Sequence, residues 1–149
     1  MFVDGHWVEA HGGGAVAEQL DENIYLALSL RNVGAGIGVM QGWCPKAGQP
    51  RSNVEPAPVE EFRGQTRDLY ISGGDIGLWQ GALRDATETV HDEIARAVSQ
   101  RQPCSVELLY SDQVGGQRAI SRFLLVPTGE DRWTASVSRH WYLDQQGPR

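Results

Sequence analysis

Hydrophobic and polar positions alternate along several stretches of the chain, most clearly over 23–33. One side of this stretch carries Ile24, Leu26 and Leu28, with Tyr, Ala and Ser between them. A period of two predicts a β-strand with one buried face. The sequence predicts further extended segments at 37–43, 67–72, 76–79, 104–112, 117–127 and 132–144.

Only the segment 86–99 has the periodicity of a helix. Asp85, followed three residues later by Glu88, forms the capping-box pattern that marks a helix start. His91 falls on the polar side of this helix, where we expect it to be solvated. The aliphatic residues that recur every four positions are Val90, Ile94 and Val98.

Many short strands with one helix favour an all-β fold, because helices do not alternate with the strands as they do in α/β proteins. The sequence predicts an immunoglobulin-like antiparallel β-sandwich of about seven to nine strands, with one inserted helix near 86–99. We expect a single domain over 1–149, with a long loop at 44–65 and a tail at 145–149. The triple glycine at 12–14 lies between two short extended pieces of 5–20 and predicts either a hairpin there or a flexible segment over 1–14.

The segment "RNVGAGIGVMQGW" carries four glycines, at positions 34, 36, 38 and 42. A dinucleotide-binding fingerprint needs GxGxxG leading from a strand into a helix. Here the spacing is GxGxG, and the residues that follow alternate like a strand. The segment therefore predicts a turn between two strands rather than a phosphate-binding loop.

Composition narrows the class of protein. The chain has 149 residues, is 40% hydrophobic and contains five Trp, which suits a folded domain with one core. Its net charge of −6 disfavours electrostatic binding of nucleic acid, so we expect no nucleic-acid partner. No leader or membrane-span pattern is visible, which predicts a cytoplasmic protein or the soluble domain of a membrane-associated one.

The two cysteines, Cys44 and Cys104, are sixty positions apart and lack metal-ligand spacing. Two unpaired buried thiols are the favoured interpretation, and one disulfide is the alternative. No cofactor and no metal site are predicted: the four His form neither HxH nor HExxH.

Four segments together, "LSLRNVGAGIGVMQGW", "LYISGGDIGLWQGALRD", "VELLYSDQVGGQRAISRF" and "SRHWYLD", resemble an uncharacterised actinobacterial β-sandwich domain family over about 20–144. More loosely, "LRNVGAG" is similar to the asparagine-glycine turn of bacterial immunoglobulin-like domains. The resemblance implies a sandwich fold and an order of strands, and it supplies no catalytic residues. The helix at 86–99 departs from the plain immunoglobulin pattern.

Basic residues gather in strands that we expect to be neighbours: Arg118, Arg122, Arg139 and His140. If Arg122 and His140 face one side together, they can hold a carboxylate or phosphate. The alternative is structural ion pairing, for which the candidate partners are Asp68, Asp75, Asp85 and Asp112.

Three tryptophans, Trp43, Trp79 and Trp141, are candidates for lining a sugar or peptide groove. The alternative is that they pack the core or its rim.

Neither a GxSxG motif nor a reactive-cysteine pattern occurs, so an enzyme is not the leading interpretation. The sequence favours a non-enzymatic interaction or accessory module with an unidentified protein partner. The alternatives are a small-ligand or anion-binding protein that uses the Arg/His cluster, and an unrecognised hydrolase.

Overall fold

The computed structural model describes residues 8–48 and 55–144, without the side chains of 13 and 66–68. Within these residues the chain forms eight β-strands, one α-helix and one short 3-10 helix. In chain order the elements are β1 (Val8–Leu20), β2 (Asn23–Asn32), β3 (Gly38–Ala47), η1 (Val59–Glu61), β4 (Arg63–Ile71), β5 (Ile76–Leu83), α1 (Thr89–Ser99), β6 (Cys104–Ser111), β7 (Arg118–Thr128) and β8 (Arg132–Tyr142).

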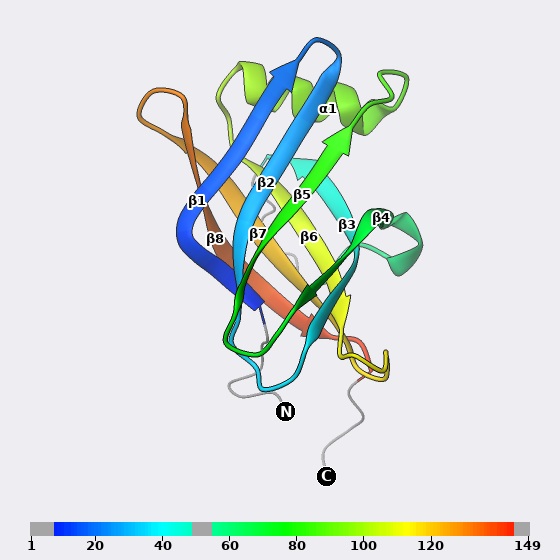
Figure 1. Ribbon diagram of the computed structural model, residues 1–149. Coiled ribbons are helices and arrows are strands. Elements are labelled where there is room, and N and C mark those ends of the chain that lie inside the picture. Colours follow the sequence, from blue (N-terminus) through cyan, green and yellow to red (C-terminus); the bar gives the residue numbers. More distant parts are fainter. Residues whose placement is uncertain (1–7, 49–54, 145–149) are drawn as a thin grey trace.

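All eight strands belong to one antiparallel sheet with the order β4-β3-β6-β7-β8-β1-β2-β5. The sheet curls strongly, so its two outermost strands, β4 and β5, come close together where a tight turn joins them (Figure 1). Near that turn, a Cβ placed on Gly77 would lie only 2.8 Å from the Ile71 side chain. Away from the turn β4 and β5 diverge, and no ladder of hydrogen bonds joins them in the described residues.

The prediction of a mainly β, antiparallel fold with one helix is confirmed, and eight strands lie within the predicted range. The immunoglobulin-like sandwich is not confirmed, because β1 pairs with both β2 and β8 and so joins all strands into one sheet. The strand bends to reach both neighbours: its register with β2 shifts between Ala10 and Ala15. Such irregularities increase local twist and let a sheet curl.

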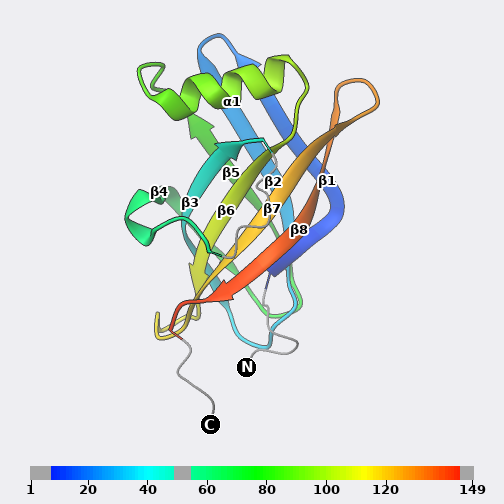
Figure 2. The same ribbon diagram turned by 180° about the vertical axis from the view of Figure 1, so that it is seen from behind.

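The concave side of the sheet holds the core. Alternate residues of β2 point inward, and Leu26, Leu28 and Leu30 have almost no exposed surface. The helix α1 lies across one end of the curled sheet and buries Ile94 and Ala97 against it (Figures 1 and 2). The long strands and the helix thus enclose one continuous cluster of apolar side chains.

The start of α1 differs from its prediction. The helix begins at Thr89 with Glu88 as its N-cap. Asp85 instead accepts hydrogen bonds from the amide and hydroxyl of Thr87, at 2.9 and 2.6 Å, and so forms a local turn before the helix. The prediction that His91 is solvated is wrong, since it is buried and its Nε2 lies 2.6 Å from the carbonyl oxygen of Glu22.

The glycine-rich segments act as turns and bends. Residues 33–37 connect β2 to β3 and no helix follows, which confirms the predicted turn between strands. The buried Asn32 holds this turn, because its side chain donates to the carbonyls of Gly36 and Ile71, both at 2.7 Å. The hairpin predicted around the glycines at 12–14 does not form: β1 runs through them, with Gly12 at a positive φ of 67°.

The predicted loop at 44–65 is shorter than expected, because β3 continues to Ala47 and β4 begins at Arg63. The predicted tail at 145–149 and the loop residues 49–54 lie outside the described residues. Cys44 and Cys104 are both free and buried, as the favoured interpretation predicted. They point to opposite faces of the sheet, since Cys104 joins the core cluster while Cys44 pairs in register with Glu107 on the other face.

Candidate functional site

A groove of about 790 Å³ opens on the outside of the sheet, where β4 and β5 diverge. Its lining comes from β1, β2, β3, β4, β5 and the segment that leads into α1. Residues far apart in the sequence therefore meet there, because the curl of the sheet brings its two end strands together. Apolar side chains form one wall, aromatic rings form the floor, and charged groups lie at one end.

The apolar wall is the outer face of β1, β2 and β5. Pairing in register places Val16 beside Ala27, and Tyr25 beside Ala82, in neighbouring strands. Leu78 is 55% exposed and lies on the same wall. Single aliphatic side chains with this much exposed surface are common on proteins. Here several of them line one concave surface, where they can bury apolar atoms of a ligand.

Two indoles close the floor of the groove. Trp43 lines the groove and packs edge-on against the buried Trp79, with ring centroids 5.4 Å apart. Gly81 makes room for both, since a Cβ there would lie 2.9 Å from the Trp79 ring and 3.0 Å from that of Trp43. Gln65 accepts a hydrogen bond of 3.0 Å from Nε1 of Trp79, which satisfies the buried indole. The groove therefore ends on a fixed aromatic floor.

An ion pair lies at the charged end. The guanidinium of Arg63 donates to Glu88 at 2.6 Å and lies over the Trp43 ring, 5.6 Å from its centroid. The pair links the beginning of β4 to the beginning of α1. Its side chains are 29% and 36% exposed, and such a pair contributes only about 0–1 kcal/mol. Either partner can exchange to a ligand at low cost.

A second guanidinium flanks the groove. Arg84 lies over the ring of Tyr25, 5.5 Å from its centroid, and donates a long hydrogen bond of 3.4 Å to the phenol oxygen. Two carboxylates, those of Glu18 and Asp85, join Glu88 in the lining. Hydrogen bonds from Thr87 lower the pKa of Asp85, so this group stays ionised at neutral pH. The lining thus carries three carboxylates and two guanidinium groups.

The basic residues singled out from the sequence lie elsewhere. Arg122 and Arg139 are partners in register on β7 and β8, and both guanidinium groups lie over the Trp141 ring, at 4.9 and 5.6 Å. His140 pairs with Ser121 and so faces the opposite side of the sheet. The structure therefore brings the two arginines together and separates them from the histidine. Their role in ligand binding stays a prediction.

Arg122 is held by a buried carboxylate. Its guanidinium lies 2.7 Å from Glu107, and the two side chains are 5% and 3% exposed. The other oxygen of Glu107 accepts the amide of Ala57 at 2.8 Å, which fastens the segment before η1 onto the sheet. This cover helps to bury the outer face of β6, a strand whose eight residues are all buried. The pairing matches the structural alternative, although the partner is a glutamate outside the four predicted aspartates.

Arg118 also has an acidic partner. Its side chain makes hydrogen bonds of 2.9 and 3.1 Å to the two oxygens of Asp144, near the end of the described chain. These hydrogen bonds lower the pKa of Asp144 and raise that of Arg118. The geometry is that of a bidentate structural pair at the surface.

His140 belongs to an internal polar network. Its Nδ1 lies 2.6 Å from Oγ of Ser121, which in turn is 2.7 Å from the hydroxyl of Tyr110. Ser121 and Tyr110 have no exposed surface, so no substrate reaches this serine in the observed conformation. The arrangement fits a satisfied network within the core.

The three candidate tryptophans have different environments. Trp79 has no exposed surface and belongs to the core. Trp43 is 5% exposed, and that small surface lines the groove. Trp141 is half-buried under two guanidinium groups. An interaction role for them stays a prediction, and Trp43 is the one with a concave surface beside it.

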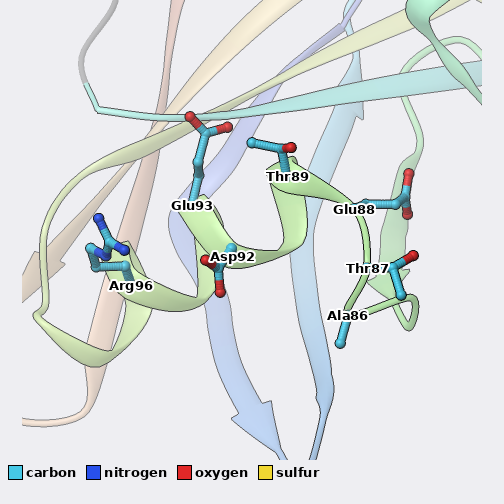
Figure 3. A pocket seen from close by; sticks show the side chains of 7 residues that line it. All are labelled: Ala86, Thr87, Glu88, Thr89, Asp92, Glu93 and Arg96. Carbon is cyan, nitrogen blue, oxygen red and sulfur yellow. The ribbon is translucent and has the colours of Figure 1, made fainter.

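A second, smaller depression of about 440 Å³ lies over the first turns of α1 (Figure 3). Glu88, Asp92 and Glu93 contribute carboxylates and Arg96 a guanidinium, and these side chains splay away from one another. Nowhere in 8–48 or 55–144 do three or more His, Cys, Asp or Glu converge as metal ligands would. Among the same residues, no helix has the length and apolar character that crossing a membrane requires.

The sequence analysis singled out both indoles of the floor, Trp43 and Trp79, and missed the ion pair. Arg63 and Glu88 are 25 positions apart and belong to no motif. They meet only because β4 and β5 curl back beside the helix start. Glu88 carries a weak signal, since it belongs to the capping-box pattern, but that pattern indicates the helix start and not a contact with Arg63.

Comparisons with known proteins add little. No protein-family model matches the chain, and no curated protein matches it. One solved structure, described as "Crystal structure of protein from Archaeoglobus fulgidus", is similar at 9% identity with a TM-score of 0.33. The match covers 89% of this chain and 95% of that one. The resemblance to an actinobacterial family stays a prediction.

Proposed function

We propose that the chain is a non-enzymatic binding module whose ligand lies in the groove between β4 and β5. The observation that carries this proposal is the combination of an apolar wall with an exchangeable ion pair above an aromatic floor. Binding sites are concave, mostly apolar, and carry few well-placed polar groups. The groove has each of these features.

The environment of the other candidate groups supports binding over catalysis. Ser121 is fully buried beneath the partly exposed His140, and Arg122 is committed to Glu107. The groove itself contains a half-exposed ion pair and aromatic rings, which recognise and orient ligands. An immunoglobulin-like origin of the sheet remains a separate proposal, supported by the turn at Asn32.

The ligand we propose is amphipathic. Its apolar part lies along Val16, Ala27 and Leu78, and its polar part reaches Arg63 or Glu88. Exchange of that ion pair costs little, because both partners are already partly solvated.

Filling the groove tests the proposal. Ala27 lines it on the outer face of β2, in register with Val16 and Gln80, so Ala27→Phe projects a ring into the groove while suiting a strand. Gly36→Phe is the control, since a Cβ on Gly36 meets nothing within 4 Å and the residue lies in the turn between β2 and β3, outside the groove lining. We expect the uncharged dye Nile red to fluoresce with the wild type and the control, and to lose this response with Ala27→Phe. Equal responses from all three proteins would refute the groove as the site.

A further inference from the structure

The groove has a second property: it is bordered by the free edge of a β-strand. β5 pairs with β2 along its whole length, from Ile76 to Leu83. Within the described residues no strand pairs with its other edge, which faces the groove. Backbone N–H and C=O groups on such an edge are a template for one more strand.

The two edge strands of the sheet differ in protection. Natural edge strands carry charges, prolines or bulges that discourage pairing. β4 has charged residues in its sequence, and its ladder with β3 shifts register after Met40. β5 reads IGLWQGAL, with no charge and no proline, and its outward-facing Ile76 and Leu78 are about half exposed. β5 therefore lacks the features that keep an edge unpaired.

We propose that the occupant of the groove is an extended peptide segment, which pairs with the free edge of β5 and lies between β5 and β4. This inference rests on the proposed function and specifies its ligand. Strand addition obtains affinity from main-chain hydrogen bonds, and specificity from alternate side chains. Side chains on one side of the peptide face Trp43 in the floor, and those on the other side extend the wall formed by Leu78 and Ala82.

A single segment fits this edge better than a second copy of the chain. A short turn joins β4 to β5, and in it the amide of Asp75 donates a hydrogen bond to the carbonyl oxygen of Ser72. This connection keeps β4 opposite the free edge of β5. Two copies could pair through β5 only if β4 moved aside in both. One extended chain needs only the existing gap.

Charge favours a segment with basic residues. Both guanidinium groups of the lining already have partners, Glu88 for Arg63 and Tyr25 for Arg84. The lining has one carboxylate more than guanidinium, and the chain carries −6 overall. These charges attract a cationic peptide and repel an acidic one.

The probes are three capped eight-residue peptides in which Lys alternates with Val, Leu or Phe. We expect at least one to bind the wild type and the Gly36→Phe control, and to bind Ala27→Phe at least tenfold more weakly. N-methylation of its backbone amides should weaken binding at least tenfold, because it removes hydrogen-bond donors and keeps the side chains. Alternate amides between Gln80 and Leu83 should become protected from hydrogen exchange.

A charge on the edge provides a second variant. Leu78→Lys introduces a gatekeeper at an exposed position and should weaken peptide binding at least tenfold. Val114→Lys is its control, since Val114 is 87% exposed in the turn between β6 and β7.

The outcomes separate the two proposals. If Nile red binds in the groove but no peptide does, or if N-methylated peptides bind equally, the peptide inference is wrong and the binding module stands. If the chain itself dimerises through β5, seen as protection of the same amides at high protein concentration, a second copy replaces the peptide. If neither dye nor peptide binds, both proposals fail.

Discussion

Two regions of the molecule contain the same three kinds of side chain in different surroundings. In each, an arginine pairs with a glutamate and lies over a tryptophan ring. The buried cluster consists of Arg122, Glu107 and Trp141, and its ion pair is almost fully enclosed. There the carboxylate also accepts the backbone amide of Ala57, so the cluster holds one segment of the chain onto the sheet.

The groove cluster consists of Arg63, Glu88 and Trp43. Its ion pair is about one-third exposed, and no further backbone group of the described chain binds its carboxylate. The comparison shows that residue type alone does not distinguish a structural pair from an exchangeable one. Burial and the additional hydrogen bonds make the difference.

The largest expected effect is the loss of the carboxylate in the buried cluster. Glu107→Ala leaves the charge of Arg122 buried without its carboxylate and frees the amide of Ala57. Breaking a buried pair in this way costs about 3–5 kcal/mol. Urea denaturation would measure it, and a loss below 1 kcal/mol would mean that the two clusters are energetically alike.

The protein should also lose stability at high pH, because the buried core contains the thiol of Cys104. Burial raises the pKa of the Cys104 thiol from 9.0 to about 11, so the folded state keeps a proton that the unfolded chain loses. The resulting contribution to the free energy of unfolding, about 3 kcal/mol, is fully present below pH 9 and is lost as the pH rises to 11.

Comparison with Cys104→Ala isolates this effect from other titrations. The difference in unfolding free energy between wild type and variant should shrink between pH 9 and pH 11. A constant difference over that range would show that the thiol is not desolvated.

A smaller effect is expected at the floor of the groove. Gly81→Ala places a methyl group within 3 Å of both indole rings, which must shift. Overpacking of this kind costs about 1–3 kcal/mol. Gly14→Ala is the control, because its Cβ meets nothing within 4 Å. Thermal unfolding with fluorescence detection would report both stability and the indole environment, and equal stability of the two variants would contradict a tightly packed floor.

The smallest effect is expected for the groove cluster itself. Glu88→Ala removes a partly exposed ion pair, and the Glu88 side chain makes no capping hydrogen bond to the helix. The expected cost is about 1 kcal/mol or less. A loss as large as that of Glu107→Ala, in the same urea experiment, would show that this pair is structural.

The strands and the helix were largely predictable, because their signals are local. The alternation in 23–33 corresponds to β2, and the aliphatic stripe in 86–99 corresponds to most of α1. The single curled sheet was not predictable, since β1 can pair with β8 only after a bend whose register shift leaves no pattern in one sequence. The glycines of β1 suggested a reversal of the chain, and instead they permit the bend.

The candidate site was predictable only in part, because strand order decides which residues meet. The structure places Arg122 with Arg139 and on the face opposite His140, and no pattern in the sequence could reveal that Arg122 has Glu107 as its partner. The groove depends on five strands and on the start of a helix. No spacing in the sequence connects Arg63 with Glu88, so their meeting follows only from the fold.

The most direct test of the groove is to follow the indole N–H signals by NMR while Nile red is added, with each signal assigned by a Trp→Phe variant. If the ligand lies in the groove, the signals of Trp43 and the adjacent Trp79 should shift with saturation, while that of Trp141 stays in place. If the Trp141 signal shifts and the Trp43 signal does not, binding occurs at the other cluster, and the assignment of the groove as the site is wrong.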